Sequence, residues 1–488
     1  MASDLRGPLP VKVDPTSNGE FRPVPLAEPV ARANAEAERR IGANARRVGL
    51  ERRAFLQSLC GAATTFLTLN EAFAALGNIG GQFHVPREAA FEPAAAGEAI
   101  AGNEFIFDVQ THMVDPAGAW RSSAGKYWES ILASFPQGSC GADDPVSCFS
   151  AEQFIKHVFM DSDTDLAVLS FVPELPEKNP LSLEEANRVR VLVDRMAGAP
   201  RLFLHAMVVP NAGPDIAPLQ LMKDAVDRYP IAAWKCYTQW GPNGRGFALD
   251  SPDIGIPFIE RARELGVRNI CIHKGLLFSG FPEELGRCAD VGRAARLYPD
   301  MNFIIYHSGY EAGTSEGPYD PAHATRGVDT LIKSVEDNGI GRNTNVYAEL
   351  GSTWRFVMRD PTTAAHLLGK LLKHIGEDNV LWGTDSIWYG SPQDQIQAFR
   401  SFQINPVLAE AHGYPELTPV LKQKVFGLNG ARVYGIDVPQ QRRKTDADPI
   451  GTRKAVYRAA ADPTFETYGP KTDAEYEALI AERGGLPT

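Results

Sequence analysis

Gln110 and His112 lie two positions apart at the end of the segment FIFDVQTH, residues 105–112. The segment begins as an apolar run typical of a buried strand and leads into a polar loop. Side chains at positions i and i+2 of a strand project from the same face, so both can reach one cation. Two histidines at this spacing would be a metal-binding pair, but here the first of the two is a glutamine.

Five further polar residues lie in or at the ends of later strand-like segments: Lys235, His273, His307, Glu349 and Asp385. Each has an ordinary structural interpretation, because a strand-end histidine or aspartate can cap a loop or helix, and Lys235 or Glu349 can be half of an ion pair. Imidazoles and a carboxylate that meet at one face of a fold are, however, the ligands of a divalent metal. We therefore predict a metal site with Asp385 and the histidines at its centre.

Eight short segments rich in apolar and β-branched residues could position these side chains. They span residues 105–112, 166–173, 201–210, 232–238, 269–275, 302–309, 345–352 and 379–386. Helical patterns such as 182–198 and 362–376 lie between them. This alternation predicts an α/β fold, a closed (β/α)8 TIM-like barrel whose site lies at the carboxyl ends of the strands. A doubly wound open sheet is the alternative, but no Gly-rich phosphate-binding motif follows the first strand.

Composition limits the class of protein. The 488 residues are 44% hydrophobic, enough for a large core, and carry a formal net charge of −11. An acidic chain without a basic stripe is a poor nucleic-acid binder, since phosphate contacts need clustered Lys and Arg. No apolar run approaches the roughly 18 residues of a membrane-spanning helix. We expect a globular protein that acts on a small molecule and forms a homo-oligomer.

The chain divides into an N-terminal extension over residues 1–80, a barrel over 100–436, and a polar tail over 437–488 that wraps the barrel or a neighbouring subunit. Arg52 and Arg53 follow an arginine-rich stretch in the extension and precede a mildly apolar stretch and an Ala-Phe-Ala motif at 72–74. This pattern resembles a twin-arginine export signal and predicts a periplasmic or exported protein that uses the twin-arginine translocase. The alternative is an arginine-rich amphipathic helix that packs on the domain or a partner in a cytoplasmic protein.

Six cysteines are too few for a disulfide framework in a chain of this length. Cys140 and Cys148 lie in one Gly/Asp/Pro-rich loop and could pair in an oxidising compartment, or remain two free thiols. Cys236 and Cys271 fall inside strand-like segments and are interpreted as small core residues.

Several motifs resemble the amidohydrolase superfamily, in particular the amidohydrolase 2 branch related to aminocarboxymuconate semialdehyde decarboxylase. They are DVQTH, ICIHKG, YPDMNFIIYHSG, IGEDNVLWGTDS and KVFGLNGARVYGI, and they cover residues 105–436. The resemblance implies a distorted barrel with one divalent metal, usually zinc, held by Gln110, His112, His273 and Asp385. It also implies that His307 is the acid/base residue and that Asp385 takes part in catalysis.

The branch contains hydrolases, lactonases, hydratases and nonoxidative decarboxylases, so the resemblance fixes the scaffold better than the reaction. The first hypothesis is a metal-dependent hydrolase of a small organic acid, amide or lactone. The alternatives are a nonoxidative decarboxylase on the same scaffold, and a metal-poor lactonase or a non-catalytic binding protein. Gln110 bears on this choice, because an amide oxygen is a weaker zinc ligand than imidazole and could select Mn or Mg, or leave the site without metal.

Residues near the other strand ends are candidates for substrate contacts. They are Lys235, Lys274, Glu349, Arg355 and Trp388, with Tyr237, Trp240, Trp354 and Tyr389 as further aromatic residues. Such a mouth would suit a flat or apolar acid, whose carboxylate Arg355 or Lys274 would pair.

Overall fold

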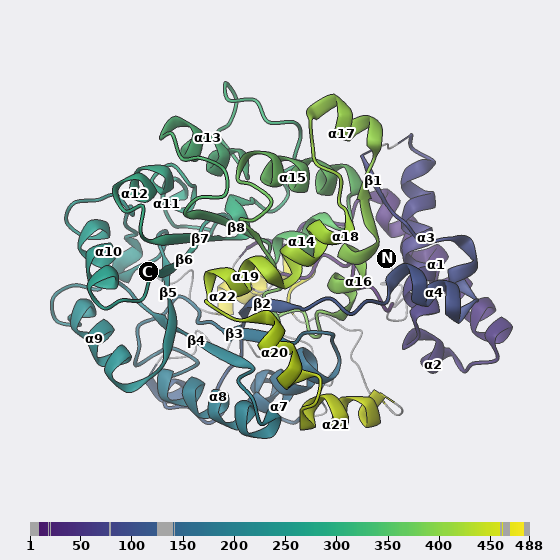
Figure 1. The fold of residues 1–488 in the computed structure, drawn as a ribbon, viewed down its shortest axis with the longest axis horizontal. Coiled ribbons are helices and arrows are strands. Elements are labelled where there is room, and N and C mark those ends of the chain that lie inside the picture. The colour runs from purple at the N-terminus through teal and green to yellow at the C-terminus, as the bar shows by residue number, and fades with distance from the viewer. Residues whose placement is uncertain are drawn as a thin grey trace.

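In the computed structural model, eight parallel strands form a barrel with helices around it (Figure 1). The structure describes residues 9–17, 19, 21–77, 80–123, 140, 142–458, 461 and 469–482. The barrel strands are β2 (Phe107–Thr111), β3 (Leu166–Leu169), β4 (Leu202–Met207), β5 (Ile231–Tyr237), β6 (Asn269–His273), β7 (Asn302–Tyr306), β8 (Val346–Glu349) and β9 (Val380–Leu381). They pair in sequence order, and each lies inside one of the eight predicted segments or overlaps it. The predicted barrel is confirmed, and the open-sheet alternative is wrong.

The first and last strand segments lie side by side and close the barrel. The backbone N–H of Val109 donates to the carbonyl of Trp382 at 3.0 Å, and that of Asp385 donates to the carbonyl of Gln110 at 2.9 Å. Thr111 and Ser386 form an isolated parallel bridge beyond the end of β9. These contacts bring the predicted strand-1 pair next to Asp385, although 275 residues separate Gln110 from Asp385.

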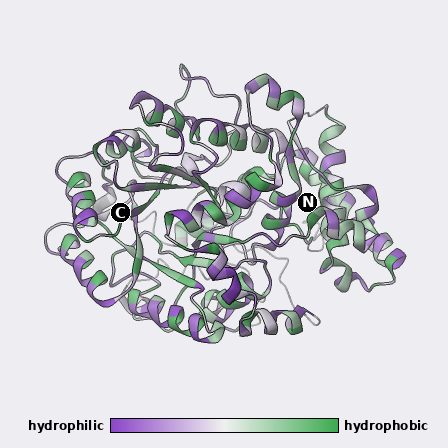
Figure 2. Cartoon of the chain, viewed as in Figure 1, coloured by the Kyte–Doolittle hydropathy of each residue, from purple (hydrophilic) through white to green (hydrophobic). Residues whose placement is uncertain are grey.

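Helices follow most of the strands and cover the barrel. They include α8 (Leu183–Ala197), α9 (Pro218–Arg228), α10 (Gly255–Glu264), α12 (Val291–Leu297), α13 (Asp329–Asp337), α15 (Pro361–His374) and α16 (Gln393–Ser401). Their ends follow ordinary capping rules: Asp360 accepts from the backbone N–H groups of Thr362 and Thr363, and Pro361 begins α15. Figure 2 shows apolar residues along the strands and polar residues on the outer sides of the surrounding helices.

Shorter helices lie in the connections and in the C-terminal part. They are α5 (Trp120–Ser123), α7 (Ala151–Phe154), α11 (Glu283–Gly286), α14 (Thr353–Val357), α17 (Pro406–His412), α18 (Pro419–Gln423), α19 (Asn429–Val433), α20 (Val438–Thr445), α21 (Pro449–Arg458) and α22 (Asp473–Glu482). The tail packs on the barrel, since Asp448, between α20 and α21, pairs with buried Arg201 at 2.5 Å.

The N-terminal extension folds into helices beside the barrel (Figure 1). They are α1 (Glu28–Val48), α2 (Arg52–Leu56) and α3 (Leu59–Ala74), and α4 (Pro93–Ile100) follows between the extension and the barrel. Strand β1 (Gly81–Phe83) follows α3 and pairs antiparallel with β10 (Phe402–Ile404), which comes after the barrel strands. The extension is thereby tied to a segment more than 300 residues away in the chain.

The apolar stretch of the export-signal pattern lies in α3, which is buried along most of its length. Phe66 of α3 contacts the Phe83 ring at 4.7 Å between centroids. Arg40 of α1 pairs with Glu71 of α3 at 2.6 Å. Arg52 and Arg53 are exposed on α2. In this fold the arginine-rich region is a packed helical layer, as in the alternative interpretation of the sequence, while export stays a prediction.

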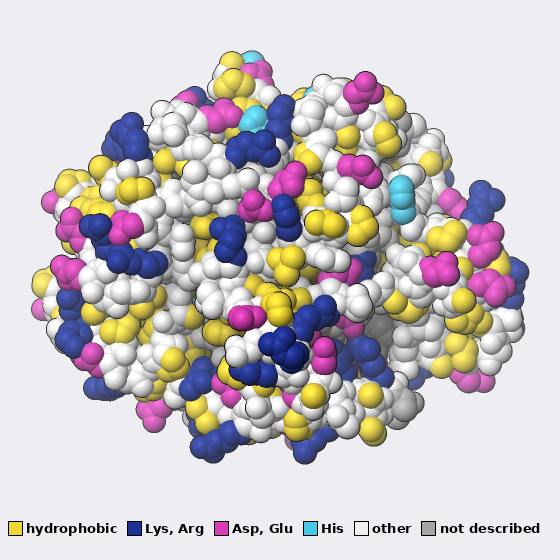
Figure 3. Space-filling view, in the orientation of Figure 1, with side chains coloured by type: hydrophobic (Ala, Val, Ile, Leu, Met, Phe, Trp, Pro, Cys, Tyr) yellow, Lys and Arg dark blue, Asp and Glu magenta, His cyan; other side chains and the backbone are white. Residues whose placement is uncertain are grey.

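Two further expectations concern the loops and the surface. Cys140 and Cys148 form a disulfide, whereas Cys236 and Cys271 are buried free thiols. Among the described helices, none has the length and hydropathy that a membrane span requires. On the face drawn in Figure 3, Lys and Arg side chains are interspersed with Asp and Glu.

Candidate active site

The loops that follow β2, β7, β8 and β9 bring the predicted site residues together in unusual backbone conformations. His307, Ser352 and Asp385 have positive φ values of 65°, 54° and 63°. A positive φ is uncommon for residues other than glycine and costs conformational energy. Such strained residues gather where their side chains must point in one required direction, which is typical of a functional site.

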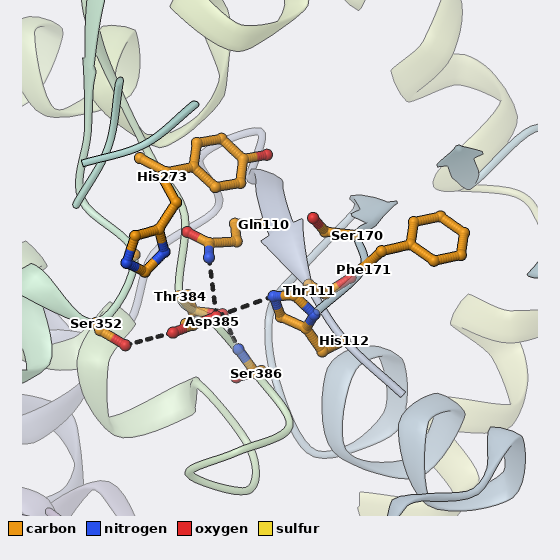
Figure 4. A network of polar contacts seen from close by, with 12 residues as sticks. Gln110, Thr111, His112, Ser170, Phe171, His273, Ser352, Thr384, Asp385 and Ser386 are labelled. Atoms are coloured by element: carbon orange, nitrogen blue, oxygen red, sulfur yellow. Dashed lines mark hydrogen bonds and ion pairs between the residues drawn. The ribbon is translucent and has the colours of Figure 1, made fainter. Parts of the chain in front are cut away.

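The carboxylate of Asp385 is the centre of one group of contacts (Figure 4). Its Oδ1 lies 3.0 Å from Nε2 of His112 and accepts a hydrogen bond from Nε2 of Gln110 at 2.9 Å. The Ser352 hydroxyl donates to Oδ2 at 2.5 Å. Burial by itself would raise the pKa of Asp385, but the hydrogen bond and charge of His112, followed by His307 and Ser352, outweigh it and lower the pKa to about 2. Asp385 is therefore ionised at neutral pH.

His273 and His307 form a second pair. Nδ1 of His273 lies 3.2 Å from Nε2 of His307, and Nδ1 of His307 lies 2.6 Å from the carbonyl of Gly351. Because a carbonyl can only accept, Nδ1 of His307 carries the proton and its Nε2 is an acceptor. Burial lowers the pKa of His307 to about 4 and that of His273 well below its ordinary value. Both rings are neutral at physiological pH.

Glu349 and Lys235 are fully buried beside these histidines. Glu349 accepts the backbone N–H of His307 at 3.0 Å and that of Gly351 at 2.6 Å. Burial raises the pKa of its carboxyl well above the ordinary value. The Lys235 ammonium lies over the Tyr306 ring, 3.8 Å from its centroid. Glu349 thus holds the backbone that carries His307, a positioning role rather than an evident substrate contact.

The other predicted substrate residues lie in different surroundings. Trp388 stacks on His112 with ring centroids 5.2 Å apart, so it lines the Asp385 group. Lys274 pairs with Asp290 at 2.7 Å. Arg355 pairs with Asp14 from the N-terminal segment at 3.1 Å. Trp354 packs in the core, where its indole N–H donates to the carbonyl of Gln395 at 2.9 Å.

Aromatic rings also cover the histidine pair. Tyr237 and Phe278 both stack on His273, each with its centroid 4.8 Å from that ring. The hydroxyl of Tyr389, also predicted at the mouth, lies 3.1 Å from the Ser352 hydroxyl and can donate to it, because the Ser352 proton goes to Asp385. The polar groups of the site are therefore enclosed by flat apolar surfaces.

Ser352 is a site residue that sequence reasoning missed, although it ends the predicted segment 345–352. Its signal was weak, because a serine after a strand is common in any loop. Asp108 was also missed. It accepts from the Thr384 hydroxyl and from the backbone N–H groups of Gln110 and Thr384, and burial raises its pKa to about 7. Asp108 thus ties the first strand to the Gly-Thr-Asp motif.

The donor atoms around Asp385 can be tested against a metal. Among the described residues, no three or more His, Cys, Asp and Glu side chains are grouped to hold an ion, so any such site needs Gln110. A metal with six ligands at about 2.1 Å has adjacent donors about 3.0 Å apart. The separations of 3.0 Å from Asp385 to His112 and 2.9 Å to Gln110 match that spacing.

The amide orientation of Gln110 completes the test. Its Oε1 is buried without a hydrogen-bond partner among the described residues, while its N–H group faces Asp385. A half-turn of the amide exchanges nitrogen and oxygen, which puts the oxygen beside Oδ1 of Asp385. Two facing oxygens are favourable only with a cation between them. The donor set of Gln110, His112 and Asp385 therefore fits one hard divalent ion, whereas Nδ1 of His273 faces Nε2 of His307 at 3.2 Å.

Sequence comparison places this barrel in a family. The model of the amidohydrolase family, described as "Amidohydrolase", matches residues 182–436, which is more than half of the chain. The chain belongs to the amidohydrolase family, as its motifs indicated. No curated protein matches it.

Solved structures resemble the chain at low identity. The 2,6-dihydroxybenzoate decarboxylase from Rhizobium is 16% identical, with a TM-score of 0.37 over 68% of this chain and 99% of that chain. The 5-carboxyvanillate decarboxylase from Sphingomonas paucimobilis is 14% identical, with a TM-score of 0.39 over 68% and 99%. A dihydroxybenzoic acid decarboxylase from Polaromonas sp. JS666, solved with bound manganese, is 13% identical, with a TM-score of 0.39 over 68% and 97%. Similarity at this level says nothing about the reaction of this chain.

Proposed function

We propose that this amidohydrolase-family barrel is a nonoxidative decarboxylase of a small aromatic acid and works with one divalent metal. The observation that supports this reaction is the enclosure of the site: Asp385, His112, His273 and His307 are each no more than 2% exposed. A substrate carboxylate enclosed by aromatic rings loses its hydration, whereas the departing CO2 is neutral. Exclusion of water therefore favours loss of CO2 over attack by water.

The chemistry assigned to the chain's own groups balances without an oxidant or reductant. The C–C bond to the carboxylate breaks, its electron pair stays on the ring carbon, and that carbon takes up a proton as CO2 leaves. When a substrate hydroxyl replaces His273 at Nε2 of neutral His307, that nitrogen can accept the hydroxyl proton and return it to the ring carbon. The phenoxide left behind regains a proton from water. Nδ1 of His307 is fixed by the carbonyl of Gly351, which keeps the imidazole oriented through both transfers.

Gln110, His112 and Asp385 are the proposed metal ligands. A bound divalent cation would supply Lewis acidity at a substrate oxygen. Mn or Mg suits an amide oxygen and a carboxylate better than zinc does, although zinc is the metal that the family resemblance implies. Asp385, held ionised by its neighbours, would supply the negative charge that such a cation requires.

A direct assay separates decarboxylation from hydrolysis. The protein, loaded with Mn or Zn, is incubated with carboxyl-labelled hydroxybenzoates and, in parallel, with lactones and aryl amides. Release of labelled CO2 is the expected result, with deuterium at the vacated ring carbon when the solvent is D2O. Turnover of a lactone or amide without any CO2 would reject the decarboxylase and establish the hydrolase alternative, which would use the same residues.

We also propose that the protein is exported by the twin-arginine route. The support is the pair Arg52 and Arg53, which is exposed on α2 and accessible to a translocase. This route carries folded proteins, so the packing of α3 in the folded chain is compatible with export. Removal of the segment up to Ala74 would expose the core that α3 covers, so we expect the exported chain to keep it.

A further inference from the structure

The N-terminal segment of residues 9–17, named here the strap, is anchored to the loop after β9 and to the first turn of α16. The ammonium of Lys12 lies 2.9 Å from Asp394 and donates to the carbonyl of Ser391 at 2.9 Å. The backbone N–H of Lys12 donates to Asp394 at 2.8 Å. Lys12 is only 6% exposed, so the strap is packed into the molecule and not merely laid on its surface.

Beyond this anchor, the strap presents a carboxylate to Arg355. The NH2 group of Arg355 donates to Oδ1 of Asp14 at 3.1 Å, and NH1 lies 3.4 Å from the carbonyl of Thr16. Within the described parts of the chain, Asp14 is the one carboxylate that pairs with Arg355. The Arg355 side chain is 1% exposed, whereas that of Asp14 is 28% exposed. The buried cation thus belongs to the barrel, and its anion is a partly exposed carboxylate of the otherwise mostly buried strap.

Arg355 is close to the proposed reaction site. It lies in α14, directly after the loop that carries Ser352, and its guanidinium lies 4.2 Å from the centroid of the Tyr389 ring. The Tyr389 hydroxyl contacts Ser352, which donates to Asp385. The side chains of Tyr389 and Ser352 therefore lie between Arg355 and the carboxylate of Asp385.

The pair between Arg355 and Asp14 leaves binding capacity unused. A guanidinium binds a carboxylate best through two parallel N–H bonds, such as those from Nε and one terminal nitrogen. Asp14 engages NH2, while Nε is buried without a hydrogen-bond partner among the described residues. A small carboxylate could engage both nitrogens, which Asp14 does not do in this arrangement.

We propose that Arg355 is a carboxylate-binding site, and that Asp14 occupies it as an internal substitute until a ligand acid displaces the strap. The ligand class is a small aromatic monocarboxylate, because the guanidinium lies among buried aromatic rings, 4.2 Å from the centroid of Tyr389 and 5.5 Å from that of Phe356, against which a flat apolar acid would pack. The statement that this acid is the substrate of the enzyme rests on the proposed function. The site itself is an inference from the contacts of Arg355.

Binding of benzoate tests the site without any need for turnover. In Asp14→Ala, calorimetry should show benzoate binding at least about 10-fold tighter than in the wild type, since the internal competitor is gone. Benzamide, which has the same shape without the charge, should bind both proteins equally. Asp14→Glu keeps a carboxylate and should stay within a factor of a few of the wild type. Equal benzoate affinity in the wild type and Asp14→Ala would overturn the proposal.

Two controls separate this site from a general attraction of anions to unpaired arginines. Asp448→Ala removes the carboxylate partner of buried Arg201 at a distant position and should create no benzoate site. Adding Arg355→Met to Asp14→Ala should abolish the gain in affinity. A gain that persists without Arg355, or an equal gain in Asp448→Ala, would count against Arg355 as the site.

If the Asp14→Ala variant does not fold, amide hydrogen exchange of the wild-type protein with and without benzoate tests the same proposal. Saturating benzoate should speed exchange of the Lys12 amide, whose bond to Asp394 opens when the strap moves away. Unchanged exchange at saturation would overturn the displacement of the strap. Benzoate binding with strap release, but without CO2 from any acid, would uphold this inference while rejecting the proposed reaction.

Discussion

Gln110→Glu turns the amide next to Asp385 into a second carboxylate. In the wild type the Gln110 N–H donates to Oδ1 of Asp385 at 2.9 Å. In the variant, two negative oxygens would face each other at the same separation. If a divalent cation belongs between these residues, the substitution should harm the protein strongly without metal and much less with it.

The magnitude follows from the distance. Two unit charges 2.9 Å apart repel by about 6 kcal/mol at an effective dielectric constant of about 20. Proton uptake by the new carboxyl limits this penalty, because protonating an ordinary glutamate at pH 7 costs only about 4 kcal/mol. The pKa of the introduced carboxyl would be raised in the folded protein. The loss of unfolding free energy is therefore largest above this raised pKa, and it disappears as the pH falls toward the pKa of about 4 that the carboxyl has in the unfolded chain.

Thermal unfolding measures this effect. With chelator at pH 7, the midpoint of Gln110→Glu should lie several degrees below that of the wild type, and Mn should restore most of the loss. A matched control is Gln395→Glu, since Gln395 in α16 is also 1% exposed but does not contact Asp385. That variant should lose stability in the same way with and without Mn.

Two results would refute this reasoning. One is a Gln110→Glu midpoint that Mn does not raise, which would remove Gln110 from the metal site. The other is a loss at pH 7 that does not shrink as the pH is lowered toward 4.5, which would mean that repulsion between the carboxylates is not its cause.

The remaining predictions test the site and the signal. In Gln110→His, a second imidazole should raise zinc affinity in a chelator titration by about 10- to 100-fold, the scale of changes around a metal site; an unchanged affinity would remove the residue from the ligands. The His307→Asn variant should keep its metal, measured by elemental analysis, while its turnover rate falls by a factor of roughly 10² to 10⁴. The Asp385→Ala variant should lose both metal and turnover. Equal loss of metal in the two variants would make His307 a metal ligand. Replacing Arg52 and Arg53 with lysine should retain the protein in the cytoplasm in fractionated cells, and an unchanged distribution would contradict export.

The barrel could be predicted from the sequence by itself, because strand-forming and helix-forming patterns are local and can be recognised in short segments of the chain. The sequence also indicated His112, His307 and Asp385, since polar residues at the ends of parallel strands meet at one mouth. The Gly-Thr-Asp motif and the family resemblance reinforced Asp385. These predictions needed only the order and the type of the elements.

The partner of each side chain depended on distances between segments far apart in the sequence. Lys274 was expected near the substrate but pairs with Asp290, and Trp354 was expected at the mouth but lies in the core. The orientation of each side chain decides these outcomes, and a residue's type and spacing do not encode it.

Only the tertiary structure connected Asp14 with Arg355, which are 341 residues apart. It also brought Ser352 into hydrogen-bond contact with Asp385, with a positive φ at both residues. No local pattern predicts such contacts, because their energies arise from the packing of the whole barrel. The sequence thus determined which groups are available for chemistry, and the closed fold decided which of them are in contact. The physical reason is that a buried polar group must form a hydrogen bond, and its partner can come from any part of the chain that the fold brings near.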